Sequence, residues 1–176
     1  IVDNNPKIPS RIKAIIDGDG EDPGPCLADM AKGLEACGAD FLAIACNTAH
    51  YYYETVCQAV DIPVINMVDC VVNQLKKYSG VSKVGVLASP AIRLTNLYEE
   101  KFSPANISIV YPDNHYQEML FQIIKKVKAG NLESKVFESY EQVCSHLKNK
   151  GITLAVVACT ELSVLDINPF LTFFDA

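Results

Sequence analysis

Short apolar runs alternate along the chain with longer segments in which apolar residues recur every three or four positions. The short runs predict buried strands, and the periodic segments predict amphipathic helices. Strands are expected at residues 41–45, 62–65, 84–88, 107–110 and 154–158, and helices at about 25–37, 47–60, 68–78, 90–102, 117–128 and 136–147. Strands that alternate with helices are typical of an α/β fold with mainly parallel sheets flanked by helices.

One unit of this pattern occurs twice. Gly38 ends a predicted helix eight residues before Cys46, and Gly151 ends another eight residues before Cys159. An apolar strand separates each glycine from its cysteine, and a threonine follows each cysteine by one or two positions. This repeat of helix, glycine, strand, cysteine and threonine predicts two pseudo-symmetric lobes, each with a cysteine at the end of a strand.

The position of these two cysteines suggests a functional role. In open parallel sheets, ligands gather at the carboxyl ends of the strands. A helix that begins after Cys46 would offer free N–H groups and the positive end of its dipole, which stabilise a thiolate or a substrate carboxylate. Two facing lobes would place Cys46 and Cys159 across one cleft, with their sulfur atoms well beyond disulfide distance. Two packed cysteines without a function are the structural alternative.

Length and charge restrict the class of function. The 176 residues form one domain or two small lobes that share a cleft, and 49% hydrophobic residues are ordinary for a globular protein. The longest apolar runs have six residues, whereas a membrane span needs about 20. The net charge of −6 argues against a nucleic-acid partner. A small anionic substrate would need particular Lys or Arg residues to bind it.

The other five cysteines are interpreted as small core residues. Seven cysteines without a Cys-x-x-Cys pair indicate neither a zinc ribbon nor a thioredoxin-type site, so no metal is expected. They are typical of a protein in a reducing compartment, and a cytoplasmic location is expected. The five are Cys26, Cys37, Cys57, Cys70 and Cys144, of which Cys37 and Cys144 fall on apolar helix stripes.

Three segments resemble one known family. Ala45-Cys46-Asn47-Thr48-Ala49-His50 and Ala158-Cys159-Thr160-Glu161-Leu162 resemble the paired cysteine motifs of the aspartate/glutamate racemase family. Asn5-Pro6-Lys7-Ile8-Pro9-Ser10-Arg11 resembles its Asn-Pro-x-Ile-Pro-x-Arg segment. Glutamate racemases carry His after the second Cys-Thr, so Glu161 favours the aspartate racemase branch.

The resemblance implies racemisation of an acidic amino acid, most simply aspartate, without a cofactor. Cys46 and Cys159 would be the two bases, one for each face of the α-carbon. Asn47, Thr48 and Thr160 would donate hydrogen bonds to the α-carboxylate in the cleft between the lobes. Asn47 and Thr48 have an alternative role as plain helix caps.

The resemblance also suggests residues for the rest of the substrate. Arg11 and Lys128 would bind its distal carboxylate. The alternative of ordinary surface cations is the stronger one for these two residues, because Arg and Lys are common on surfaces. Glu161 could orient Cys159 or hold the substrate amine, or it could be a solvated residue at a helix start. His50 lies one turn from Cys46, which leaves open a place near the thiol or an ordinary helix position.

The family pattern sets further expectations. Residues 1–68 plus 167–176 would form the first lobe and 69–166 the second. The family's N-terminal strand with its Gly-rich loop and its last helix are expected to be missing from this segment. Ile92 stands where the family has a hydroxyl residue that contacts the substrate carboxylate. Many members dimerise, so the expected partners are a small-molecule substrate and a second copy, with no membrane or nucleic acid.

Two other functions stay open. A hydantoin racemase or maleate-isomerase-like enzyme would use the same fold, with one cysteine as a nucleophile in the second case. A racemase-like protein that binds a small acid without turnover is the third option, and Ile92 favours it somewhat. The sequence does not distinguish aspartate from glutamate or from other amino acids as the substrate.

Overall fold

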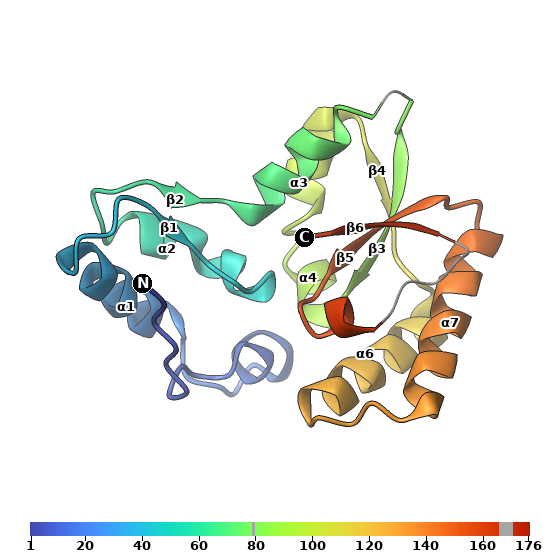
Figure 1. Ribbon diagram of the computed structural model, residues 1–176, viewed down its shortest axis with the longest axis horizontal. Coiled ribbons are helices and arrows are strands. Elements are labelled where there is room, and N and C mark those ends of the chain that lie inside the picture. The colour runs from blue at the N-terminus through green and yellow to red at the C-terminus, as the bar shows by residue number, and fades with distance from the viewer. Residues whose placement is uncertain (79, 166–170) are drawn as a thin grey trace. The chain divides into compact units, whose positions relative to one another are not determined.

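A computed structural model describes residues 1–78, 80–165 and 171–176, which fold into two compact units, Ile1–Met67 and Val68–Ala176. Each unit contains parallel strands flanked by helices (Figure 1). The predicted α/β class with parallel sheets is therefore confirmed. Neither unit contains, within those described residues, a helix long and apolar enough to cross a membrane.

The first unit is built around a short parallel sheet. Strands β1 and β2 pair with Leu42 opposite Val64 and Ala43 opposite Ile65. Helix α1 begins with Pro25 in its first turn, where the missing proline N–H costs no hydrogen bond. The elements are a π-helical turn Lys13–Asp17, α1 (Gly24–Ala36), β1 (Leu42–Ala43), a 3-10 turn Thr48–Tyr52, α2 (Tyr53–Cys57) and β2 (Val64–Ile65).

The second unit contains a four-stranded parallel sheet in the order β4-β3-β5-β6. Its strands are β3 (Lys83–Ala88), β4 (Ser108–Val110), β5 (Leu154–Ala158) and β6 (Thr172–Asp175). Its helices are α3 (Met67–Leu75, whose first residue closes the first unit), α4 (Pro90–Leu94), α5 (Glu99–Phe102), α6 (Asn114–Lys128) and α7 (Ser134–Asn149), with 3-10 turns at Ser103–Ala105 and Leu162–Val164.

Both faces of this sheet are covered, which explains the unbroken apolar strands in the sequence. Successive residues of a strand point to opposite faces. Leu87 packs with α6 and α7 side chains such as Leu120 and Leu147, whereas Val86 packs on the other face with Tyr98 and Phe102. The central strands β3 and β5 are thereby fixed between two apolar layers.

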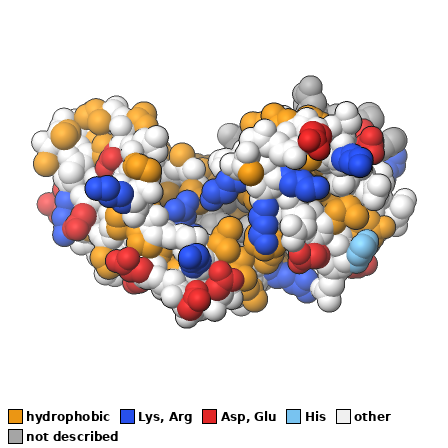
Figure 2. Space-filling view, turned by 90° about the horizontal axis from the view of Figure 1, so that it is seen from below, with side chains coloured by type: hydrophobic (Ala, Val, Ile, Leu, Met, Phe, Trp, Pro, Cys, Tyr) orange, Lys and Arg blue, Asp and Glu red, His pale blue; other side chains and the backbone are white. Residues whose placement is uncertain are grey.

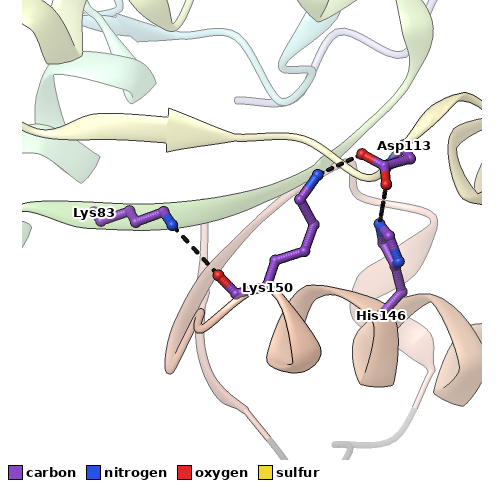
Figure 3. A network of polar contacts seen from close by, with 4 residues as sticks. All are labelled: Lys83, Asp113, His146 and Lys150. Atoms are coloured by element: carbon purple, nitrogen blue, oxygen red, sulfur yellow. Dashed lines mark hydrogen bonds and ion pairs between the residues drawn. The ribbon is translucent and has the colours of Figure 1, made fainter.

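A polar network ties the end of α7 to the start of α6 and of β3 (Figure 3). The Asp113 carboxylate accepts a hydrogen bond from the Lys150 ammonium and lies 3.4 Å from Nε2 of His146. Nζ of Lys83 donates to the carbonyl of Lys150 at 3.4 Å. The Lys150 hydrogen bond lowers the pKa of Asp113 below its ordinary 3.8.

The predicted elements differ from the structure most clearly at three places. The strand expected at 41–45 has ladder pairing only at Leu42–Ala43. The helix expected at 47–60 is a 3-10 turn followed by the short α2. The helix expected at 90–102 is divided into α4 and α5, because Asn96 adopts a left-handed conformation with φ of 52° between them.

The end of the chain also corrects an expectation. The family resemblance places residues 167–176 in the first lobe, whereas Thr172–Asp175 forms β6 and pairs with β5 in the second unit. The backbone hydrogen bonds of an edge strand decide this placement, and a four-residue strand carries little signal in the sequence. Residues 167–170 lie outside the described residues.

The cysteines outside the repeat differ in their environment. Cys144 is buried in the core under α7, as predicted, and burial raises the pKa of its thiol to about 12. The prediction of core positions is wrong for Cys37 and Cys70, which are exposed, while Cys26 and Cys57 are half-buried. Cys37 follows the last residue of α1, where the helix ends before its apolar stripe reaches that position.

Candidate active site

In the first unit, Cys46 follows β1 at the carboxyl end of the strand, as the repeat predicted. The residue is half-buried, and its N–H donates to the carbonyl of Ile44 at 2.8 Å in a tight turn. After this tight turn the chain leaves the strand and enters the 3-10 turn of Thr48–Tyr52. The thiol therefore lies at the strand edge where ligands of parallel sheets bind.

The alternative role as a helix cap is not confirmed for Asn47, which precedes the 3-10 turn. Asn47 has helical backbone angles, φ −57° and ψ −49°, and its side chain makes no capping hydrogen bond. A residue that caps a helix with its side chain normally has an extended backbone. Thr48 is the first residue of the 3-10 turn and is half-buried, and Asn47 is buried. Both nevertheless follow Cys46 directly, where a ligand at this strand end would lie.

His50 belongs to the same loop, although sequence reasoning left its role open. Its Nδ1 atom lies 2.9 Å from the carbonyl oxygen of Cys46, and its Nε2 atom accepts a hydrogen bond from the N–H of Met67 at 3.0 Å. The side chain is 2% exposed. The spacing of one helical turn gave the proximity, but only the structure gives the contact with the main chain of Cys46.

Arg11 lies in the same unit as Cys46. It is half-buried, and its guanidinium donates to the carbonyl of Pro9 at 3.5 Å. The pKa of Tyr52 is raised mainly by burial and further by the negative charge of Asp22. The positive charge of Arg11 lowers this pKa and so opposes the two effects. Because Tyr52 ends the 3-10 turn that follows Cys46, the charge of Arg11 acts on this part of the unit.

In the second unit, Cys159 follows β5 at the carboxyl end of the sheet. Its side chain is buried, and its thiol donates to Oε2 of Glu161 at 3.1 Å. The same Oε2 accepts from the hydroxyl of Thr160 at 3.4 Å. The three residues that the second motif supplied thus form one local cluster, in which Thr160 is exposed and Glu161 is half-buried.

The strand order places this cluster at a switch point of the sheet. From β3 the chain moves to β4 on one side and then returns to β5 on the other side of β3. Crevices for ligands form at such points in α/β sheets. Ala88 pairs with Ala158, so Ser89 follows β3 as Cys159 follows β5. Sequence reasoning did not include Ser89 in the site, because register between distant strands is not readable from the sequence.

Other buried groups surround this end of the sheet. Gln117 of α6 donates from Nε2 to the carbonyl of Ala88 at 2.9 Å, which fixes the helix to the end of β3. Burial is the main cause that raises the pKa of Tyr98 and of Tyr140. Negative charge on Cys159 raises the pKa of Tyr98 further, and for Tyr140 the neighbouring Cys144 contributes more than Cys159 does. Both phenols therefore stay neutral near Cys159.

Two residues singled out in the sequence lie elsewhere. Ile92 is fully buried in the apolar layer with Val86 and Tyr98, so its side chain packs in the core. Lys128 is the last residue of α6 and is exposed. Among residues 1–78, 80–165 and 171–176, Lys128 makes no ion pair, which leaves its ammonium available to a ligand.

The structure groups the predicted residues within each unit. Arg11, Cys46, Asn47 and Thr48 belong to the first unit, and Lys128, Cys159, Thr160 and Glu161 belong to the second. The placement of Cys46 opposite Cys159 concerns both units and stays a prediction. In the part of the chain that the structure describes, no three metal-ligating side chains converge on one point.

Comparison with known proteins identifies the family. The model of the Asp/Glu/hydantoin racemase family matches residues 1–168. The chain belongs to this family. The chain is similar to the solved structure of the aspartate racemase from Picrophilus torridus, with a TM-score of 0.86 and 30% identity. The match covers 99% of this chain and 73% of the Picrophilus torridus chain. An aspartate racemase homologue from Pyrococcus horikoshii shares 27% identity over 87% of the chain and 68% of its own, with a TM-score of 0.71.

Curated family members are similar in sequence. The broad specificity amino-acid racemase RacX of Bacillus subtilis is 28% identical over 153 residues, which are 84% of this chain and 64% of that protein. The glutamate racemase of Persephonella marina is 26% identical over 139 residues, 78% of this chain and 52% of that protein. The chain thus spans between about half and two thirds of the length of these curated family members.

Proposed function

We propose that the protein is an amino-acid racemase that uses no cofactor and acts on an acidic amino acid, most simply aspartate. One observation carries the proposal: each unit has a cysteine beyond the carboxyl end of a parallel strand, within the motif shared with the family. Cys46 lies three residues after the end of β1, and Cys159 directly follows β5. Membership of the Asp/Glu/hydantoin racemase family supports the reaction class.

Two cysteines suffice for the chemistry if one is a thiolate and the other a thiol. The thiolate takes the α-proton from one face of the amino acid, and the electron pair of the C–H bond stays on the α-carbon. The opposite thiol then gives its proton to the other face, and its sulfur becomes the new thiolate. The charge is conserved, the configuration is inverted, and the reverse reaction exchanges the two roles.

The α-carbanion needs stabilisation, because the α-proton of an amino acid is very weakly acidic. We assign hydrogen bonds to the α-carboxylate to Asn47, Thr48 and Thr160, which directly follow the two cysteines. Donors that are already in place stabilise the developing charge without reorganisation. Glu161 accepts a hydrogen bond from the Cys159 thiol in the structure, which supports a role in holding that thiol rather than in binding the substrate amine.

The substrate preference rests on cations in both units. Arg11 and Lys128 are the residues that we assign to the distal carboxylate, and neither guanidinium nor ammonium has an ion pair among the described residues. The likeness to the Picrophilus torridus aspartate racemase favours aspartate. The likeness to RacX supports a second candidate, a racemase of broad amino-acid range.

The surface agrees with a small-molecule substrate. The net charge is −6, whereas a nucleic-acid partner would favour a clustered basic surface. Both acidic and basic side chains appear on the face shown in Figure 2. We propose that the protein binds neither nucleic acid nor a membrane, works in the cytoplasm and forms a homodimer.

The test is an assay in deuterated water with a panel of D- and L-amino acids. Chiral chromatography follows inversion, and loss of the α-proton NMR signal follows exchange. Racemisation of aspartate with α-deuteration is expected. Equal rates on many neutral amino acids would favour the broad-range reading, and activity on hydantoins or maleate alone would favour the alternative enzymes. Calorimetric binding of aspartate without exchange would contradict a racemase.

A further inference from the structure

We infer that His50 is a positioning residue for Cys46, and that it acts as a neutral imidazole with its proton on Nδ1. The inference rests on the proposed function in so far as it makes Cys46 a base in the reaction. It goes beyond the cysteine pair because it names the group that fixes the main chain of one cysteine.

The hydrogen-bond partners of His50 determine its tautomer. The carbonyl oxygen of Cys46 can only accept, so the Nδ1 atom at 2.9 Å must carry the proton. The N–H of Met67 can only donate, so the Nε2 atom at 3.0 Å must present its lone pair. A protonated imidazole would place two N–H groups opposite each other at Met67. The two contacts are therefore satisfied together only by the neutral ring.

The ring is held from other sides as well. His50 is 2% exposed, and it stacks on Tyr53 with an interplanar angle of 5° and a centroid separation of 6.2 Å. The hydroxyl of Tyr53 donates to the carbonyl of Val64 in β2 at 2.8 Å. The loop after β1 is thus connected through His50 and Tyr53 to both β2 and the start of α3.

These contacts fix the peptide groups on both sides of Cys46. Its N–H is bonded to the carbonyl of Ile44, and its own carbonyl is bonded to His50. The direction of a side chain follows from the backbone that carries it, and misplacement by about 1 Å can cost a proton-transfer enzyme a hundredfold in rate. Loss of the His50 contact would release the carbonyl and allow the Cys46 thiol to turn away from its place.

Two amide substitutions separate the contacts of the ring. In His50→Asn, the side-chain amide reaches about as far as Nδ1 and can still donate to Cys46. In His50→Gln, the amide reaches about as far as Nε2, so it can accept the hydrogen bond from the N–H of Met67 but cannot donate to Cys46. His115→Asn on the exposed first turn of α6 is a matched control for the histidine change.

Racemisation and the alkylation rate of Cys46 by iodoacetamide, measured by peptide mass spectrometry, are the two readouts. We expect His50→Gln to lower kcat by roughly a hundredfold with KM changed less than about threefold. We expect it to change the alkylation rate of Cys46 several-fold, with Cys37 as the reference thiol. His50→Asn should keep kcat within about tenfold of the wild type and the alkylation rate of Cys46 within about threefold.

The outcomes distinguish this inference from the proposed function. If the wild type exchanges no α-proton but Cys46 reactivity still separates the two variants, the racemase proposal fails and the positioning role stands. Equal behaviour of both variants in alkylation and in kcat would overturn the positioning role. Nitrogen-15 NMR of the wild-type imidazole needs no variant: a proton on Nδ1 near neutral pH is expected, and a proton on Nε2 would overturn the inference even where the variants fail to fold.

Discussion

The Sγ atom of Cys159 lies 3.1 Å from Oε2 of Glu161, two residues further along the chain. A carboxylate can only accept a hydrogen bond, so this contact exists for the thiol and becomes a repulsion for the thiolate. This contact therefore favours the protonated form of Cys159, which is the proton donor in a two-base reaction. Cys46 has no such carboxylate contact among the described residues.

The first prediction concerns this contact. Glu161→Gln keeps the size of the side chain and removes its negative charge, so the thiolate of Cys159 should form more readily. We expect alkylation of Cys159 by iodoacetamide at pH 7 to become several-fold faster. Peptide mass spectrometry of timed samples measures the rate for each cysteine separately.

Two other cysteines calibrate that experiment. Cys37, which is exposed after the last residue of α1, is the reference thiol and should react at its wild-type rate. Cys144, whose thiol has a pKa of about 12 through burial, should stay unmodified in both proteins unless the fold opens. An unchanged or slower reaction of Cys159 in Glu161→Gln would show that the carboxylate does not govern this thiol.

The second prediction concerns recognition of the substrate. Arg11→Leu removes a cation of the first unit that makes no ion pair among the described residues. If Arg11 binds the distal carboxylate, KM for aspartate should rise by roughly tenfold to a hundredfold, the usual range for a lost hydrogen bond to a charged group. KM for alanine should change little, and steady-state kinetics on both substrates measures the difference.

Lys13→Leu is the matched control for this change. It removes the same charge two residues away, in the π-helical turn, from an exposed side chain. Lys128→Leu applies the same test to the second cation. Equal effects of Arg11→Leu on aspartate and on alanine would assign the arginine to the scaffold.

The third prediction is a dependence of stability on pH at the network of Figure 3. The hydrogen bond from Lys150 lowers the pKa of Asp113 in the folded protein below 3.8. A carboxyl group with a lowered pKa stabilises the fold fully above the unfolded value, and this contribution disappears as the pH falls through the folded value. The melting temperature of Asp113→Asn should therefore lie below that of the wild type at pH 5 to 7, by a few degrees at most because the site is exposed.

The difference should vanish on acidification toward pH 3 and below. Lys150→Met should show the same pH pattern, and the double variant should add little to either single change. Differential scanning calorimetry over this pH range measures all three proteins. A difference that persists unchanged at the lowest pH would mean that packing, and not the charge, is responsible.

The sequence predicted those parts of the fold in which local pattern and burial agree. Strand β5 was placed at Leu154–Ala158 because a strand buried on both faces reads as one apolar run. The sequence predicts helix α1 because Pro25 lies in its first turn and Gly38, with φ of 86°, follows its end. Strand β6 was missed, since its placement depends on pairing with β5.

The candidate site divides in a similar way. Cys46 and Cys159 could be placed at strand ends from the repeat alone. The Cys159–Glu161 contact was one of three roles that the sequence left open for Glu161, and the structure shows it. The neighbour Ser89 depends on the register between β3 and β5, which are far apart in the chain. The His50–Met67 bond likewise joins a loop to a helix start 17 residues away, and no local pattern encodes it.

The last prediction tests whether each cysteine serves one face of the substrate. Each enantiomer presents its α-hydrogen to only one of the two thiols, so each direction of the reaction has its own base. A serine hydroxyl is far too weak a base to replace a thiolate. Racemisation should therefore fall by roughly a hundredfold to ten-thousandfold in both Cys46→Ser and Cys159→Ser, the range for loss of a general base.

Proton abstraction should survive in part and with opposite preference in the two variants. With Cys159→Ser, Cys46 should still exchange the α-hydrogen of one enantiomer of aspartate with deuterated water, and with Cys46→Ser the other enantiomer should exchange. NMR of each pure enantiomer measures this exchange, and elimination from a substrate with a β-leaving group should show the same preferences. Cys144→Ser is the control, because its buried thiol takes no part. If both variants lost exchange with both enantiomers, or if either variant kept full racemase activity, the assignment of one base to each face of the substrate would be wrong.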